Sequence, residues 1–158
     1  YSQLGYQAES GPWRNFYLTG AQDLLKKAVP YTSKLINDGV LSQMDMGTLL
    51  DYCAIQLNGE KAGGKEAVIN INFTDTKEKV MLMLKNGVLN HRLGSQDKKA
   101  DLTMEIAKMD FVKLFFGRTD LQTLRKTNKV KTTGDTKAID MIRSACEPAD
   151  PNFNIVLP

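Results

Sequence analysis

The chain has 158 residues, with 21 lysines and arginines, 18 aspartates and glutamates, two cysteines and one histidine. This length suits one domain, or one domain with a fragment of another, and it excludes a large multidomain enzyme. The scarcity of histidine and cysteine excludes an all-protein His/Cys zinc site, and a net charge of +3 does not require a nucleic-acid partner.

A helix is predicted near the amino terminus. Pro12 suits an early helical position, where its missing N–H costs little. An aromatic stripe follows at helical spacing and consists of Trp13, Phe16, Tyr17, Gly20 and Leu24. Pro30 ends the pattern. We expect the stripe to pack in a core or against another domain.

A second helix is predicted from Asp45, which can cap its amino terminus, to about Leu57. Cys53 lies on its apolar face, so we expect a small buried hydrophobe rather than a nucleophile. Residues 59–65 match the first seven positions of a phosphate-binding loop, but Glu66 stands where serine or threonine should bind magnesium. The segment also follows a helix and enters a strand, the reverse of the usual order, so we predict a flexible connector.

Four strands are predicted between residues 67 and 107, because apolar and polar residues alternate with a period of two in the first and fourth, while the centre of the second, residues 79–85, is apolar on both faces. Asn86-Gly87 marks the turn between the second and third strands, since type I′ hairpins need positive φ at both positions. We expect an antiparallel meander with one face toward the core.

Helices dominate the rest of the chain. We predict helices from Asp110 to Phe116 and from Asp120 to about Lys126, a strand over residues 129–133, and a helix over residues 136–145. The apolar tail at residues 151–158 is expected to pack back on the body. Strands followed by helices indicate an α+β fold, in which a sheet of about five strands is covered by helices on one side and preceded by an amino-terminal helix.

Soft apolar residues of the sheet and the later helices form the candidate ligand site. Methionine adapts to irregular partners, and a helix laid over a sheet with large side chains can enclose a groove for an alkyl chain. Ordinary core packing is the alternative. The candidate groove residues are Met81, Met83, Met104, Phe111, Leu114, Phe115, Phe116, Leu121 and Leu124.

Charge is concentrated late in the chain. Residues 108–143 contain nine basic and four acidic side chains, a net charge of +5. A solvated face explains this stretch, because no aromatic residue lies in its densest part, residues 125–131, for stacking on bases. The more specific alternative is that this basic stretch attracts a small anionic headgroup. His91 has no carboxylate or second histidine nearby in sequence, and we expect a structural or solvent-facing role.

Several segments resemble one enzyme family. The run Trp13-Arg14-Asn15-Phe16-Tyr17-Leu18-Thr19-Gly20-Ala21-Gln22 resembles the segment that closes the central helical region of bacterial alkyl sulfatases. Residues 72–78, 86–91 and 154–158 resemble the C-terminal domain of these enzymes, which is similar to sterol carrier protein type two. The resemblance implies that residues 1–40 end a helical dimerisation region and that residues 41–158 form a sterol-carrier-like lipid-binding domain.

The resemblance also implies a longer parent protein, and because the chain begins at Tyr1 rather than Met we expect an excised piece or a processed product. The parent would be a zinc hydrolase of the metallo-β-lactamase superfamily that cleaves alkyl sulfates such as dodecyl sulfate. Its His/Asp metal motif is absent here, so no catalytic residue carries over, and we expect zinc in the missing catalytic domain and no cofactor in this chain. The sequence does not specify the cellular location of the parent, for which the periplasm and secretion are the alternatives.

The chain itself is therefore expected to be a non-catalytic module. It would bind the aliphatic chain of an alkyl sulfate, a fatty acid or another amphiphile and present it to the catalytic domain. The alternative is a structural or dimer-stabilising domain without a ligand. A free-standing hydrolase that uses Cys53 or His91 has little support. No apolar run approaches the roughly 18 residues of a membrane span, so no transmembrane segment is expected.

Overall fold

The structure, a computed structural model, describes residues 1–26 and 37–147. These residues fall into two compact units, which we call unit 1 (1–26) and unit 2 (37–147) and describe separately. The expected stop at Pro30 and the expected packing of residues 151–158 lie outside the described residues.

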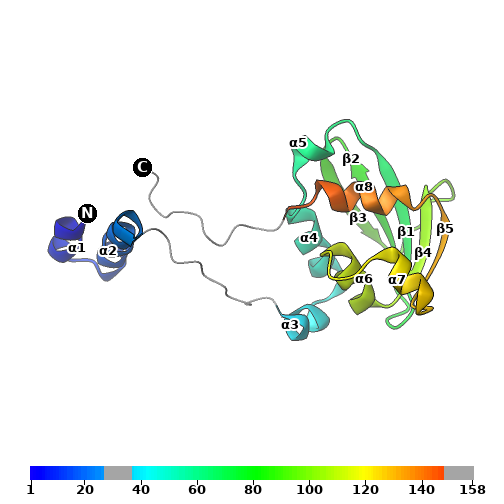
Figure 1. Cartoon of the computed structure of the whole chain (residues 1–158), viewed down its shortest axis with the longest axis horizontal. Coiled ribbons are helices and arrows are strands. Elements are labelled where there is room, and N and C mark those ends of the chain that lie inside the picture. The colour runs from blue at the N-terminus through cyan, green and yellow to red at the C-terminus, as the bar shows by residue number, and fades with distance from the viewer. Residues whose placement is uncertain (27–36, 148–158) are drawn as a thin grey trace. The chain divides into compact units, whose positions relative to one another are not determined.

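Unit 1 is a pair of helices, α1 (Ser2–Gln7) and α2 (Gly11–Lys26). The sequence predicts α2, whereas α1 is a helix that the sequence pattern does not predict (Figure 1). Gly5 lets the two helices approach closely, because a Cβ there would lie 2.7 Å from Cδ2 of Leu18. The aromatic stripe does not form a core within unit 1, since Trp13 is 63% exposed and Phe16 is 56% exposed.

Unit 2 contains the predicted five-stranded sheet, and its strands run in the order β3-β2-β1-β4-β5. The strands are β1 (Ala67–Phe73), β2 (Lys79–Lys85), β3 (Val88–Leu93), β4 (Leu102–Ile106) and β5 (Val130–Gly134). The predicted hairpin turn is confirmed, because Asn86 and Gly87 have φ of 52° and 72°. The α+β fold with helices on one side of the sheet is also confirmed.

The sheet departs from the predicted antiparallel meander at one place. β4 pairs in parallel with β1, with Ile71 opposite Met104, instead of continuing beside β3. The connection from β3 to β4 is held against β1 by Asn70, which is 5% exposed. Its Nδ2 donates to the carbonyl oxygen of Asp97 at 2.7 Å, and its Oδ1 accepts from the backbone N–H of Asp97 at 3.0 Å. This reciprocal contact guides the chain across the sheet, so β4 emerges on the far side of β1.

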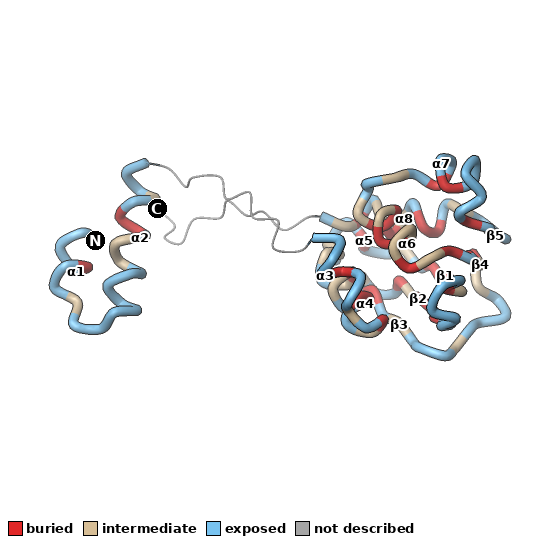
Figure 2. Tube along the Cα trace, turned by 90° about the horizontal axis from the view of Figure 1, so that it is seen from below, coloured by how far each residue is buried: buried red, intermediate tan, exposed pale blue. Residues whose placement is uncertain are grey.

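The connection from β3 to β4 crosses one face of the sheet, and six helices of unit 2 cover the opposite face. Figure 2 shows buried segments gathered where the helices and the sheet meet. The six helices are α3 (Asp38–Gln43), α4 (Met46–Ile55), α5 (Gly59–Ala62), α6 (Lys108–Phe115), α7 (Leu121–Lys126) and α8 (Lys137–Ala145). α3 runs across the predicted boundary between residues 40 and 41, and that division into family domains stays a prediction.

The helix starts are mostly as predicted. The carboxylates of Asp45 and Asp120 cap α4 and α7 by accepting from the backbone N–H groups of Thr48 and Thr123. Asp110 is not a cap, because α6 begins earlier, at Lys108. Residues 59–65 are not simply a connector, since α5 forms there. Among the described residues, no helix combines the length and the apolar character that crossing a membrane requires.

Candidate functional site

Most predicted groove residues fill the core. Met104, Phe111 and Leu114 have no exposed surface, and Phe115, Leu121 and Leu124 are at most 8% exposed. The space between the sheet and helices α6 and α7 is therefore packed with side chains rather than open. Ligand binding by these residues stays a prediction.

The two methionines of β2 lie apart from the others. Met81 is opposite Asn70 of β1, on the face that the connection from β3 to β4 crosses, whereas Met104 is opposite Ile71 on the helix-covered face. Met83 shares the face of Met81 because the two residues are two positions apart along a strand. The structure thus separates Met81 and Met83 from the aromatic side chains of α6.

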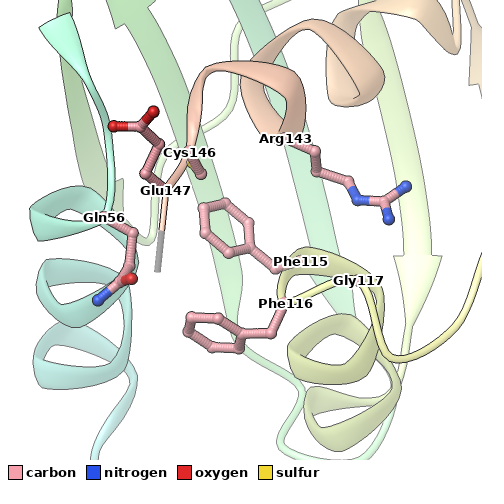
Figure 3. Close-up of a pocket in the computed structure, with 7 residues that line it drawn as sticks. All are labelled: Gln56, Phe115, Phe116, Gly117, Arg143, Cys146 and Glu147. Carbon is pink, nitrogen blue, oxygen red and sulfur yellow. The ribbon is translucent and has the colours of Figure 1, made fainter. Parts of the chain in front are cut away.

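An open cleft, called the cleft below, lies at the carboxyl ends of helices α4, α6 and α8 of unit 2. Its volume is about 230 Å³. It is lined by Gln56 after α4, by Phe115, Phe116 and Gly117 at the end of α6, and by Arg143, Cys146 and Glu147 at the end of α8. Figure 3 shows the two phenylalanine rings projecting from the end of α6 toward Gln56, while the side chain of Arg143 runs over Gly117. Of the nine predicted groove residues, Phe115 and Phe116 meet here.

A row of aromatic rings connects the cleft to the core. Phe73 packs edge-on against Phe111 at 5.6 Å between ring centroids, Phe111 lies 5.9 Å from Phe115, and Phe115 lies 5.5 Å from Phe116. The ring of Tyr52 on α4 lies 5.5 Å from that of Phe116. Such pairs prefer tilted and edge-to-face geometry and each adds about 0.5–1.5 kcal/mol beyond area burial. The wall of the cleft is therefore a rigid extension of the core.

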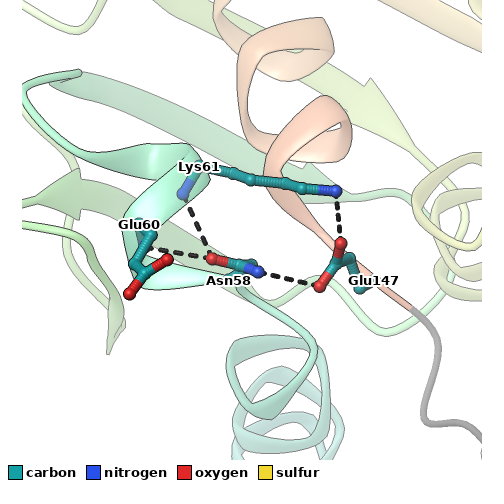
Figure 4. Close-up of polar contacts among 4 residues, drawn as sticks. All are labelled: Asn58, Glu60, Lys61 and Glu147. Atoms are coloured by element: carbon teal, nitrogen blue, oxygen red, sulfur yellow. Dashed lines mark hydrogen bonds and ion pairs between the residues drawn. The ribbon is translucent and has the colours of Figure 1, made fainter.

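The carboxylate of Glu147 is engaged in a polar network beside the cleft (Figure 4). One oxygen accepts from Nδ2 of Asn58 at 2.8 Å, and the other pairs with the ammonium of Lys61. Asn58 Oδ1 also accepts from the backbone N–H groups of Glu60 and Lys61 and so caps α5. Hydrogen bonds from Asn58 and Lys61 lower the pKa of Glu147 from its ordinary value. The network ties the end of α8 to α5 and neutralises this negative charge.

The two thiols are poor nucleophiles. Burial raises the pKa of Cys53 to about 12, with a smaller contribution from Cys146, and burial raises the pKa of Cys146 to about 11. Thiolates, not thiols, carry out nucleophilic chemistry, so neither side chain is activated. The predicted role of Cys53 as a buried hydrophobe is confirmed, because it has no exposed surface.

His91 lies outside the cleft, on β3. Its Nδ1 lies 3.7 Å from a carboxylate oxygen of Asp51 on α4, a neighbour that the sequence alone does not reveal. The sequence resemblance implies zinc for the parent protein, in a catalytic domain that this sequence does not include. Among the described residues of both units, no three side chains of the His, Cys, Asp and Glu types gather to hold a metal ion.

The basic stretch at residues 108–143 is not one surface. Lys108 is 8% exposed and donates from Nζ to the carbonyl oxygens of Ser42 and Met44. Lys129 lies 3.6 Å from an oxygen of Asp110. Arg143 is the member of this stretch that lines the cleft. The sequence holds a signal that Arg143 lies beside the core rather than on the solvated side of its helix. Arg143 follows the core residue Ile139 by about one helical turn, so the two share a face.

Comparisons with known proteins agree with this architecture. The alkyl sulfatase C-terminal family model matches residues 34–158. A linear primary-alkylsulfatase from Pseudomonas sp. is 39% identical over 99% of this chain and 23% of its own length. The solved structure of the stereoselective inverting sec-alkylsulfatase Pisa1 from Pseudomonas sp. superimposes with a TM-score of 0.88 and 35% identity, over 98% of this chain and 24% of that one.

A more distant likeness is to sterol carrier protein-2 like-3 from Aedes aegypti, with 16% identity and a TM-score of 0.45 over 60% of this chain and 92% of that one. Nothing about ligands follows from it. This chain spans about a quarter of the length of the alkylsulfatases that it matches. Because the family model covers most of the sequence, the resemblance seen in the sequence is confirmed, and the chain belongs to the alkyl sulfatase C-terminal family.

Proposed function

We propose that this chain is a non-catalytic module of an alkyl-sulfatase-like zinc hydrolase, and that the cleft binds the aliphatic chain of an alkyl sulfate or a similar amphiphile for presentation to the catalytic domain. The observation that carries this proposal is the open cleft with walls formed by Phe115 and Phe116.

The cleft limits how much of an alkyl chain it holds. Its volume of about 230 Å³ is below the roughly 300–1,000 Å³ that is usual for small-molecule pockets. Part of a dodecyl chain therefore enters, and the remainder stays outside or meets the catalytic domain. Each buried methylene contributes about 0.8 kcal/mol, so short chains are the appropriate probes.

Calorimetric titration of the chain with octyl sulfate, below its micelle concentration, tests the proposal. We expect saturable binding of one ligand per chain. Phe116→Ala removes a half-buried ring from the wall and should weaken binding about tenfold, the equivalent of about 1.4 kcal/mol. Val88→Ala truncates an apolar side chain that is 52% exposed on β3, outside the cleft, and should change nothing. Non-saturable uptake, or equal binding by both variants, would contradict the proposal.

A structural role is the second candidate, and the exposed surface of unit 1 favours it. Trp13 and Phe16 are more than half exposed, and Leu25 is 80% exposed. In this role unit 1 would stabilise a dimer of two copies of the chain. Sedimentation velocity over a range of concentrations checks it. Concentration-dependent dimers that disappear in Trp13→Ser, together with no ligand binding, would favour this candidate over the first, and a strict monomer would refute it.

A further inference from the structure

Arg143 has hydrogen-bonding capacity that its neighbours leave unused. Its side chain is 22% exposed, and its Nη1 lies 3.5 Å from an oxygen of Asp140, which is itself 62% exposed. The Nε atom is buried and has no hydrogen-bond partner among the described residues. A guanidinium carries five N–H donors, and a buried donor without an acceptor costs free energy. Because Nε is buried, an acceptor that arrives from solvent would meet the exposed part of the guanidinium, where donors remain.

Gly117 leaves room beside this guanidinium. A Cβ on Gly117 would lie 3.9 Å from Nη2 of Arg143, and the glycine itself has a φ of 68° as it ends α6. The guanidinium thus lies near bare backbone, and Figure 3 shows its side chain extending past Gly117 on the side away from the two phenylalanine rings. A ligand whose tail lies on the rings must therefore pass over Gly117 to bring its head to the cation.

The other charged groups at the cleft leave this positive charge effective. Glu147 is neutralised by Lys61 and held by Asn58. Gln56 is uncharged. Asp140 pairs with Arg143 from the solvent side, at a distance long for a hydrogen bond. An anion that brings two oxygens to the guanidinium forms shorter, charge-assisted bonds.

We propose that Arg143 binds the charged head of an anionic amphiphile whose tail lies on Phe115 and Phe116, and that the cleft therefore takes the intact sulfate ester in preference to the alcohol that remains after sulfate is removed. This inference rests on the proposed function, because it needs the tail in the cleft. It adds a basis on which the cleft selects its ligand. The sulfate ester and the alcohol have the same tail, so only the negative charge distinguishes them. A module with this preference releases the product.

Three ligands with eight carbon atoms each test the inference: octyl sulfate, octanoate and 1-octanol, each titrated into the full chain. We expect octyl sulfate to bind about tenfold or more tightly than 1-octanol, as charge-assisted hydrogen bonds allow. Arg143→Met should remove this difference while leaving 1-octanol binding within about twofold. Octanoate that binds like octyl sulfate supports a general anionic head, and octanoate that binds like 1-octanol supports a sulfate-specific one.

The matched control is Arg125→Met on α7, because Arg125 contacts Thr132 on the sheet and does not line the cleft. It should keep the full preference for octyl sulfate. Added salt gives a second measurement that needs no variant: it should weaken octyl sulfate binding by the wild-type chain and leave 1-octanol binding unchanged.

The outcomes separate the two proposals. Equal affinity of the wild-type chain for octyl sulfate and 1-octanol, or an unchanged preference in Arg143→Met, would overturn the role of Arg143 while the apolar cleft stands. A chain that binds none of the three ligands would refute the proposed function and this inference together.

Discussion

Lys108 is a buried lysine that joins two helices, and its replacement is a direct test of the fold. Its ammonium donates to the carbonyl oxygens of Ser42, at 3.1 Å, and Met44. These carbonyls belong to the last turn of α3 and to its C-cap residue, where positive charge is favourable. α3 has only six residues, too few for independent helical stability. We therefore expect Lys108→Met to destabilise unit 2 and to loosen α3 first.

The magnitude follows from these contacts. A hydrogen bond from a charged group contributes about 1.5–3 kcal/mol. Two such bonds are lost, but Ser42 is exposed and Met44 is half-buried, so water can replace part of the interaction. Methionine also keeps the apolar stem in place. We expect a net loss of about 2 kcal/mol, which lowers the urea midpoint by about 1 M for an m value near 2 kcal/mol/M.

Far-UV circular dichroism is the appropriate probe, because it follows the helices and strands of unit 2 directly, whereas the single tryptophan, Trp13, belongs to unit 1. Hydrogen exchange should show greater loss of protection at Leu41 of α3 than at Ile71 of β1. Lys126→Met is the matched control, since Lys126 is exposed. A midpoint for Lys108→Met that equals or exceeds that of the control would refute the assigned role of this ammonium.

Three further predictions concern caps, a glycine and the thiols. Asp45→Ala and Asp120→Ala should each lower the urea midpoint at pH 7, because each removes the side chain that caps a helix. Because cap hydrogen bonds lower the pKa of both carboxyls, this stability is present above their ordinary pKa of 3.8 and is lost as pH falls through the lowered values, so the double variant should lose less between neutral and acidic pH. Gly134→Ala should cost about 3 kcal/mol or more, because φ is 106° and the new Cβ would lie 2.3 Å from a backbone oxygen. Cys53 and Cys146 should react slowly with a thiol reagent at pH 8 and rapidly after unfolding, since burial raises both pKa values.

The readouts for these variants are urea midpoints at several pH values and thiol labelling rates in the presence and absence of urea. An acid loss of stability that is the same in wild type and the double variant would contradict the cap assignment. A Gly134→Ala chain of native stability would contradict the strain expected at this last residue of β5. Fast labelling of the folded chain would show that the thiols are accessible.

Local signals in the sequence were sufficient for the hairpin and for two helix caps. Asn86-Gly87 specifies positive φ at both positions, and Asp45 and Asp120 each bond to a residue three positions later. These features depend on neighbours in the sequence. The parallel pairing of β1 and β4 depends instead on Asn70 meeting a loop 27 residues away, and alternation of polar and apolar residues carries no information about that contact.

The candidate site shows the same division. The sequence grouped Met81 and Met83 with the other groove candidates, but the face of β2 on which they lie depends on the register with β1, where Asn70 is opposite Met81. The aromatic residues of α6 were correctly expected to gather, yet their depth was not, because burial depends on how α4 and α8 pack around them. Arg143 was counted among the charges of a basic stretch, and its place in the cleft became visible when α8 was positioned.

The size of the cleft and the nature of its rim together favour transient binding. A fully buried octyl tail gains about 6 kcal/mol at about 0.8 kcal/mol for each methylene, whereas association costs about 4–15 kcal/mol in lost freedom. Apolar contact alone therefore gives weak binding, and the charged head then decides which amphiphile stays. A deeper pocket would hold substrate and product alike, because both bury the same tail. In the proposed function, a shallow cleft with one cation at its rim holds an anionic chain long enough to pass it on and retains the neutral product poorly.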